Sequence, residues 1–113
     1  MAKSNKPIFW SLFAAGGTLA AFLAPVLVLL FLLVALGRAP DLFSYAQAHA
    51  FAAHWLGKLF LLAVITLFLW HAAHRLRVTA HDFGLRQDAI VAVLVYLAAA
   101  AGTVMSVVLL LRI

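Results

Sequence analysis

The sequence predicts an all-α integral membrane protein, a bundle of three transmembrane helices, and three observations lead to this prediction. Of its 113 residues, 68% are hydrophobic and only 10% are charged, whereas soluble domains are usually about 45–50% apolar and about 25% charged. The few charges separate three apolar stretches, each about as long as the 20 residues that a membrane-spanning helix needs. The chain has no cysteine, which excludes a disulfide-rich module as well. We therefore expect a single membrane domain over residues 1–113.

The first predicted span covers approximately residues 13–36. No charged residue occurs between Lys6 and Arg38, and Trp10 stands at the entry to the apolar stretch. Pro25 lies inside the span, which a membrane helix tolerates because neighbouring helices satisfy the carbonyl that proline leaves free. The stretch is longer than the apolar region of a signal peptide, about 7–15 residues, so we expect an uncleaved helix.

Two further spans follow a break at Gly37–Asp41. The second covers approximately residues 51–70 and carries Lys58 in its first third. The third covers residues 89–111 and has a charged residue directly before and directly after it. Three spans place the N-terminal tail and the loop between the second and third spans on the same side of the membrane.

The basic residues predict an N-terminus inside and a C-terminus outside. The side of the N-terminal tail has five lysines and arginines against two or three on the other side, and the basic side is usually cytoplasmic. Because these residues flank apolar segments, we expect them to contact lipid headgroups, and we expect no binding of nucleic acid. The five are Lys3, Lys6, Arg75, Arg77 and Arg86, and the opposing residues are Arg38, Arg112 and a snorkelling Lys58.

Small residues recur at intervals of four in the first and third spans. This spacing lets helix backbones approach closely, which is how membrane helices gain van der Waals contact. We predict that these faces pack against other helices, including those of a partner. They are Gly16, Ala20 and Ala24, the adjacent Gly17 and Ala21, and in the third span Ala98, Gly102 and Ser106.

The end of the second span carries the chain's densest group of polar side chains. If the helix continues past Trp70, then His71, His74 and Arg75 lie on one face at intervals of three and four. One interpretation is a collar that binds lipid phosphates. The other is a site at the membrane boundary that handles protons and anionic charge, because histidine exchanges a proton near neutral pH and arginine stays cationic. The roles of His71, His81 and Lys58 stay unassigned.

Several chemistries are disfavoured by the pattern of polar residues. A zinc site from His71 and His74 lacks a third ligand. Haem held within the chain is disfavoured because the first and third spans contain no histidine, so His54 would need a partner to supply the second ligand. Serine-histidine-aspartate catalysis lacks a nucleophile beside Asp82 or Asp88.

The predicted topology brings Trp10 to the same membrane boundary as His74 and Arg75. An indole N–H, an imidazole and a guanidinium together suit an apolar ligand with carbonyl oxygens that gains negative charge on reduction. A quinone has these properties.

The chain resembles the family of the fumarate reductase D subunit over almost its whole length. The resemblance rests on the N-terminal Lys6–Gly17 (KPIFWSLFAAGG), on Ala24-Pro25-Val26 in the first span, and on the polar end of the second. In that end, Leu69-Trp70 is followed by His74-Arg75 and His81-Asp82. Where the family often has a second pair of histidines, this chain has Arg77-Val78, so no role of that pair is carried over.

The resemblance implies a multi-pass anchor in the bacterial inner (cytoplasmic) membrane, within a four-subunit quinol:fumarate reductase. Its partners would be a flavoprotein subunit, an iron–sulfur subunit and the second small anchor, the C subunit, with flavin and clusters only in those partners and no haem here. Trp10, His74 and Arg75 match the residues of the menaquinol site. The chain alone would then catalyse nothing, because it holds no redox centre.

Two alternatives from other classes stay open. One is an anchor of the succinate dehydrogenase type, which works in the reverse direction with a haem. The other is a small structural or assembly protein of the membrane that has no redox role.

The predicted topology is testable with reporter fusions. A reporter fused after Arg112 should behave as periplasmic, because the excess of basic residues holds the other side in the cytoplasm. The same reporter inserted after Arg86 is the control and should behave as cytoplasmic. Cytoplasmic activity of the Arg112 fusion would reject the predicted orientation.

Overall fold

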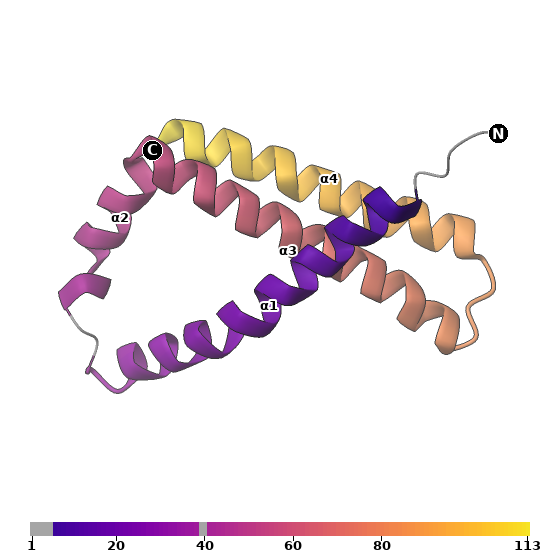
Figure 1. Ribbon diagram of the computed structural model, residues 1–113, viewed down its shortest axis with the longest axis horizontal. Helices are drawn as coiled ribbons and strands as arrows, with labels where there is room; N and C mark the ends of the chain where they lie inside the picture. The colour runs from indigo at the N-terminus through magenta and orange to yellow at the C-terminus, as the bar shows by residue number, and fades with distance from the viewer. Residues whose placement is uncertain (1–5, 39–40) are drawn as a thin grey trace.

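The computed structural model describes residues 6–38 and 41–113, and within them the chain is built from helices (Figure 1). Three long apolar helices, each long enough to cross a membrane, confirm the predicted all-α membrane fold. The elements in order are α1 (Lys6–Ala35), the 3-10 helix η1 (Asp41–Phe43), α2 (Tyr45–Ala53), α3 (Trp55–Asp82) and α4 (Asp88–Arg112). Lys3 of the topology argument and Ala39 and Pro40 of the predicted break lie outside the described residues.

The helix boundaries differ from the predicted ones at both ends of α3. The stretch before it forms the separate helix α2, which ends at Ala53 and is followed by His54, where the backbone is extended (φ −71°, ψ 139°). The His54 Nδ1 atom then accepts a hydrogen bond from the Leu56 N–H at 3.2 Å and caps α3. At its other end α3 continues well past Trp70 to Asp82, which is the condition under which His71, His74 and Arg75 share one face of the helix.

Glycine ends both α1 and α3. Gly37 has φ +69° and Gly84 has φ +89°, a left-handed backbone conformation that glycine adopts without a steric penalty. Beyond each glycine the next N–H bonds back into the helix, from Arg38 to the Leu33 carbonyl at 2.8 Å and from Leu85 to the Ala80 carbonyl at 3.1 Å. These bonds satisfy carbonyls that a helix end leaves without partners, so each helix stops sharply before its loop.

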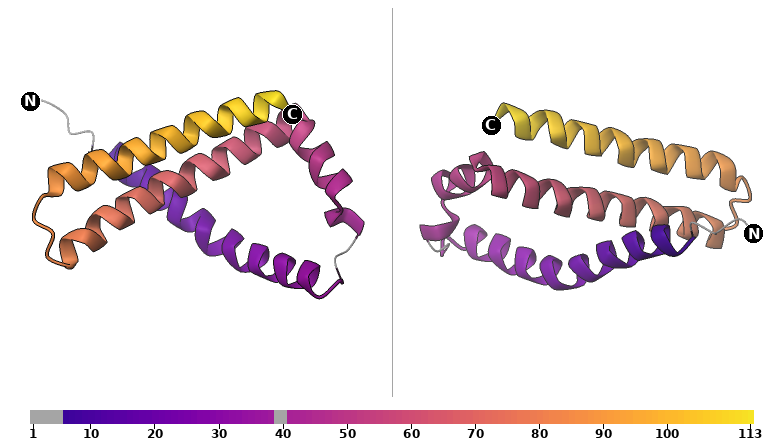
Figure 2. Two further views of the ribbon diagram at one scale, coloured as in Figure 1. Left: turned by 180° about the vertical axis from the view of Figure 1, so that it is seen from behind. Right: turned by 45° about the horizontal axis from the view of Figure 1, so that its top comes forward.

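Helix α3 lies between the other two long helices (Figure 2, right). It runs antiparallel to α4 along its length, whereas α1 contacts α3 through its N-terminal half and then diverges (Figures 1 and 2). The crossing is close at Gly16, where an added Cβ would lie 2.5 Å from the Leu67 carbonyl oxygen and 2.9 Å from the His71 Cβ. The predicted small-residue face of α1 therefore packs on α3 at Gly16.

The small-residue face of α4 also packs on α3, with a shift in register. An added Cβ at Gly102 would lie 2.9 Å from Leu69 Cδ1, so Gly102 faces α3 as predicted. Ala98 is exposed, and its neighbour Ala99 is buried instead. The packed stripe follows the interval of three between Ala99 and Gly102, because a helix turns 3.6 residues at a time.

The packed interior is thin for a chain of this length. Only Ala73, Ala99 and Leu110 are buried among the described hydrophobic residues. The half of α1 beyond Pro25 presents apolar side chains outward, with Phe31 71% exposed. Lipid or an apolar protein surface must cover this area in the membrane.

Replacing Gly102 by leucine should separate α4 from α3. The larger side chain would meet Leu69, and overpacking of this kind typically costs about 1–3 kcal/mol. The expected result is a lower melting temperature and a lower level of the protein in the membrane. Ala101→Leu, at the exposed neighbouring position, is the matched control. Equal behaviour of the two variants would mean that Gly102 faces lipid.

Candidate functional site

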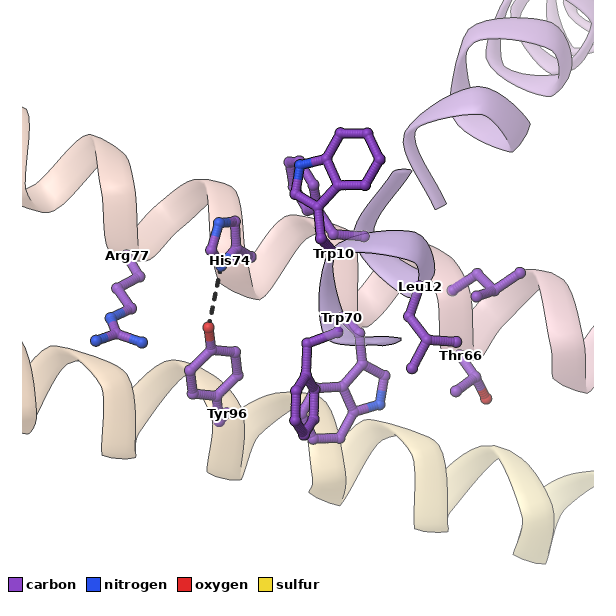
Figure 3. Close-up of a pocket in the computed structure, with 10 residues that line it drawn as sticks. Trp10, Leu12, Thr66, Trp70, His74, Arg77 and Tyr96 are labelled. Carbon is purple, nitrogen blue, oxygen red and sulfur yellow. Dashed lines mark hydrogen bonds between the residues drawn. The ribbon is translucent and has the colours of Figure 1, made fainter. Parts of the chain in front are cut away.

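A cleft of about 750 Å³ lies beside α3, where the N-terminal half of α1 and the first half of α4 flank it (Figure 3). All three long helices contribute to its wall. Most of the lining is apolar or aromatic, and the polar groups gather toward the α3–α4 turn. The lining residues are Phe9, Trp10, Leu12 and Phe13 of α1, Thr66, Leu67, Trp70, His74 and Arg77 of α3, and Tyr96 of α4.

Helix α3 is longer than the apolar thickness of a membrane. Its 28 residues rise about 1.5 Å each and span about 42 Å, against a hydrocarbon core of about 30 Å. Most of its polar residues occupy the last three turns of the helix, from His71 to Asp82, whereas Lys58 and Thr66 lie nearer its start. The cleft runs along α3 from Thr66 and Leu67 to Arg77, in the half of the helix that carries most of its polar residues.

His71 connects α1 to α3. Its ring stacks on Phe13 with centroids 4.5 Å apart, and its Nδ1 atom lies 3.0 Å from the Phe13 carbonyl oxygen. The lack of a side chain at Gly17 makes room for this ring, because an added Cβ there would lie 2.8 Å from His71 Cε1. His71 is thus used in helix packing and is not part of the cleft wall.

His74 lies one turn further along α3 and does line the cleft. The edge of its ring meets Phe13, with centroids 4.6 Å apart. Its Nδ1 atom forms a hydrogen bond with the Tyr96 hydroxyl at 3.2 Å (Figure 3). His74 is therefore in contact with α1 on one side and α4 on the other.

Arg77 forms the polar rim and is paired with Asp88, the first residue of α4. Its Nε donates to Asp88 Oδ1 at 2.8 Å and its Nη2 donates to Oδ2 at 2.5 Å. Both side chains are partly exposed. This two-point pairing closes the α3–α4 turn, and it leaves the guanidinium 5.8 Å from the centre of the Tyr96 ring.

Two of the three predicted site residues meet at this cleft. Trp10 and His74 both line it, although Trp10 lies within α1 and not before it. Arg75 is exposed and is absent from the lining. On α3 it lies one turn beyond His71.

Sequence reasoning missed Trp70, Arg77 and Tyr96 as lining residues. Trp70 and Arg77 could have been found, since they lie four residues before and three residues after His74 on the same helix face. To find Tyr96, the pairing of α3 with α4 in a helical hairpin had to be considered as well. In two antiparallel helices, residues equally far from the turn lie side by side, and His74 and Tyr96 are equally far from Leu85.

Three apolar helices, each long enough to cross a membrane, define an integral membrane protein. Comparison with known families is specific: the model of the family of the fumarate reductase D subunit matches residues 1–111. The chain belongs to this family, and it is accordingly a membrane anchor of a bacterial multi-subunit enzyme.

Similar proteins include the fumarate reductase D subunit of Aliivibrio fischeri, which is 39% identical over 108 residues, 94% of this chain and 90% of the relative. The fumarate reductase D subunit of Photobacterium profundum is 42% identical over 82 residues, 71% of this chain and 68% of the relative. That of Vibrio parahaemolyticus is 43% identical over 82 residues, 71% of this chain and 66% of the relative.

Proposed function

We propose that the cleft receives the head group of menaquinol when this anchor is assembled in quinol:fumarate reductase. In this proposal the chain and its partner anchor, the C subunit, hold the iron–sulfur and flavoprotein subunits at the cytoplasmic face of the inner membrane. The enzyme then transfers electrons from menaquinol to fumarate during anaerobic respiration.

The composition of the cleft wall is the observation that carries the proposal. Its volume, about 750 Å³, falls within the range of small-molecule sites, about 300–1,000 Å³. The rings of Phe9, Phe13 and Trp70 offer apolar surface for a fused aromatic ring. Trp10 and His74 add hydrogen-bonding groups, and the aromatic rings beside them are a feature that a collar for lipid phosphates would not require.

The chemistry divides between this chain and its partners. Oxidation of the quinol to the quinone would release two protons and two electrons, and an iron–sulfur cluster in the partner would take the electrons one at a time. His74 accepts or relays a proton from a quinol hydroxyl. Trp10 can only donate, through its indole N–H, and it therefore bonds a quinone oxygen.

The exposure of Trp10 indicates that the assembled site has a second wall. Its side chain is 68% exposed, so a quinone ring bound beside it would be in contact with water on that side. A partner subunit that covers this face would exclude water and strengthen each electrostatic contact inside. In this arrangement the partner subunit also covers the outward-facing Arg75. The positive charge of Arg75 then stabilises the anion that forms as the quinol loses a proton.

Replacing Trp10 by phenylalanine should lower quinol-driven fumarate reduction. The substitution removes one hydrogen-bond donor and keeps an aromatic ring, so we expect a loss of about fivefold to tenfold. Activity with a soluble artificial donor should be unchanged, because those electrons enter through the partners. Trp55→Phe, at a similarly exposed tryptophan at the other end of α3, is the control. Equal quinol activity of both variants would refute the assignment of Trp10.

Arg75→Leu tests the remaining site residue. It removes the charge and keeps much of the apolar stem, and loss of one preorganised electrostatic contact typically costs about 10²–10³ in rate. Because Arg75 is exposed, we expect about tenfold or less. The measurement is the ratio of quinol-driven to artificial-donor activity in membranes. A wild-type ratio would place Arg75 outside the site and favour contacts with lipid phosphates.

A further inference from the structure

We propose that Tyr96 is a positioning residue that orients His74 for proton transfer in the cleft. The inference rests on the proposed quinol site and deepens it. In it the Tyr96 oxygen accepts a hydrogen bond from His74 Nδ1–H, and His74 Nε2 is left free as the proton acceptor. Figure 3 shows the two side chains meeting across the α3–α4 interface, with 3.2 Å between Nδ1 and the hydroxyl oxygen.

The Tyr96 ring is held from two sides, so its hydroxyl has a defined direction. Trp70 stacks on it with ring centroids 5.8 Å apart and an angle of 21° between the planes. Arg77 lies near its face, with Cζ 5.8 Å from the ring centre, within the range of a cation–π contact. Trp70 and Arg77 are two turns apart on α3, and His74 lies between them.

Asp88 in turn fixes Arg77. The carboxylate takes both guanidinium hydrogen bonds, and a two-point pair of this kind sets the plane of the guanidinium as well as its position. A row of contacts therefore runs from Asp88 at the start of α4 through Arg77 and Tyr96 to His74. Three members of this row, Arg77, Tyr96 and His74, line the cleft.

The surroundings of His74 determine what its second ring nitrogen can do. From α1 the ring meets Phe13, which has no titratable group. From α4 it meets Tyr96, with Asp88 beyond it and already paired with Arg77. On α3 the neighbouring His71 is engaged with the Phe13 backbone through its own Nδ1. Because Nδ1 of His74 bonds to Tyr96, Nε2 is the ring nitrogen that remains free for a ligand in the cleft.

This arrangement suits acceptance of a proton from a quinol. In neutral imidazole one nitrogen carries the hydrogen and the other accepts. With Nδ1–H bonded to the tyrosine oxygen, Nε2 accepts the hydroxyl proton. The ring then becomes a cation, and its bond to Tyr96 becomes charge-assisted and stronger. The contact with Tyr96 therefore favours proton transfer more than it favours quinol binding.

The test is a double-mutant cycle in the complete membrane-bound enzyme. The variants are Tyr96→Phe, His74→Ala and both together, assayed with menaquinol and with a soluble artificial donor. Tyr96→Phe keeps the ring that contacts Trp70 and Arg77 and removes only the hydroxyl. Tyr45→Phe is the control, since Tyr45 is the chain's other tyrosine and is 84% exposed on α2.

We expect Tyr96→Phe to lower kcat with menaquinol about fivefold to tenfold, with KM within about twofold and donor-driven activity unchanged. In the His74→Ala background the same substitution should have no further effect, because the hydroxyl acts through His74. The proposal is overturned if Tyr96→Phe is silent, raises only KM, or retains its full effect without His74. If His74→Ala leaves menaquinol turnover unchanged, the assignment of His74 under the proposed function fails, and this inference fails with it.

Discussion

The crossing of α1 over α3 at Gly16 is the contact on which the rest of this structure depends. A hydrogen atom in place of a side chain lets the two backbones approach, and a Cβ there would lie 2.5 Å from the Leu67 carbonyl oxygen. That approach brings Phe13 onto His71 and His74 and places Trp10 opposite α3. Without it the cleft would have no wall from α1, and its indole and imidazole groups would not share one cavity.

The same geometry explains why this chain is an anchor and not a free-standing bundle. The N-terminal half of α1 packs on α3, and the rest of α1 diverges from it (Figure 1), so among the described helices the second half of α1 has little to pack on. In a membrane, association depends on van der Waals packing of helices, since lipid already satisfies apolar surface. Membership in a multi-subunit enzyme supplies the chains that can provide such packing.

Much of the fold could be predicted because length and hydrophobicity dominate in a membrane. Three apolar stretches required three helices, and Gly16 and Gly102 marked where they pack. The break at His54 was missed, because the local cap that creates it lies inside an apolar run. In the site, Trp10 and His74 followed from topology alone, whereas Tyr96 depended on the register of the α3–α4 hairpin. Arg75 was predicted on the same basis, but its side chain is exposed and does not line the cleft.

Photoaffinity labelling with a menaquinone analogue measures directly whether this cleft is the quinone site. Membranes that contain the whole enzyme would be irradiated with an azido-substituted analogue, and labelled peptides would be located by mass spectrometry. A quinone seated in the cleft should label α1 near Trp10 and α3 near His74, and excess menaquinone should suppress both labels. Labelling confined to the partner subunits, or to α2 at the opposite end of α3, would contradict a quinone site formed by this chain.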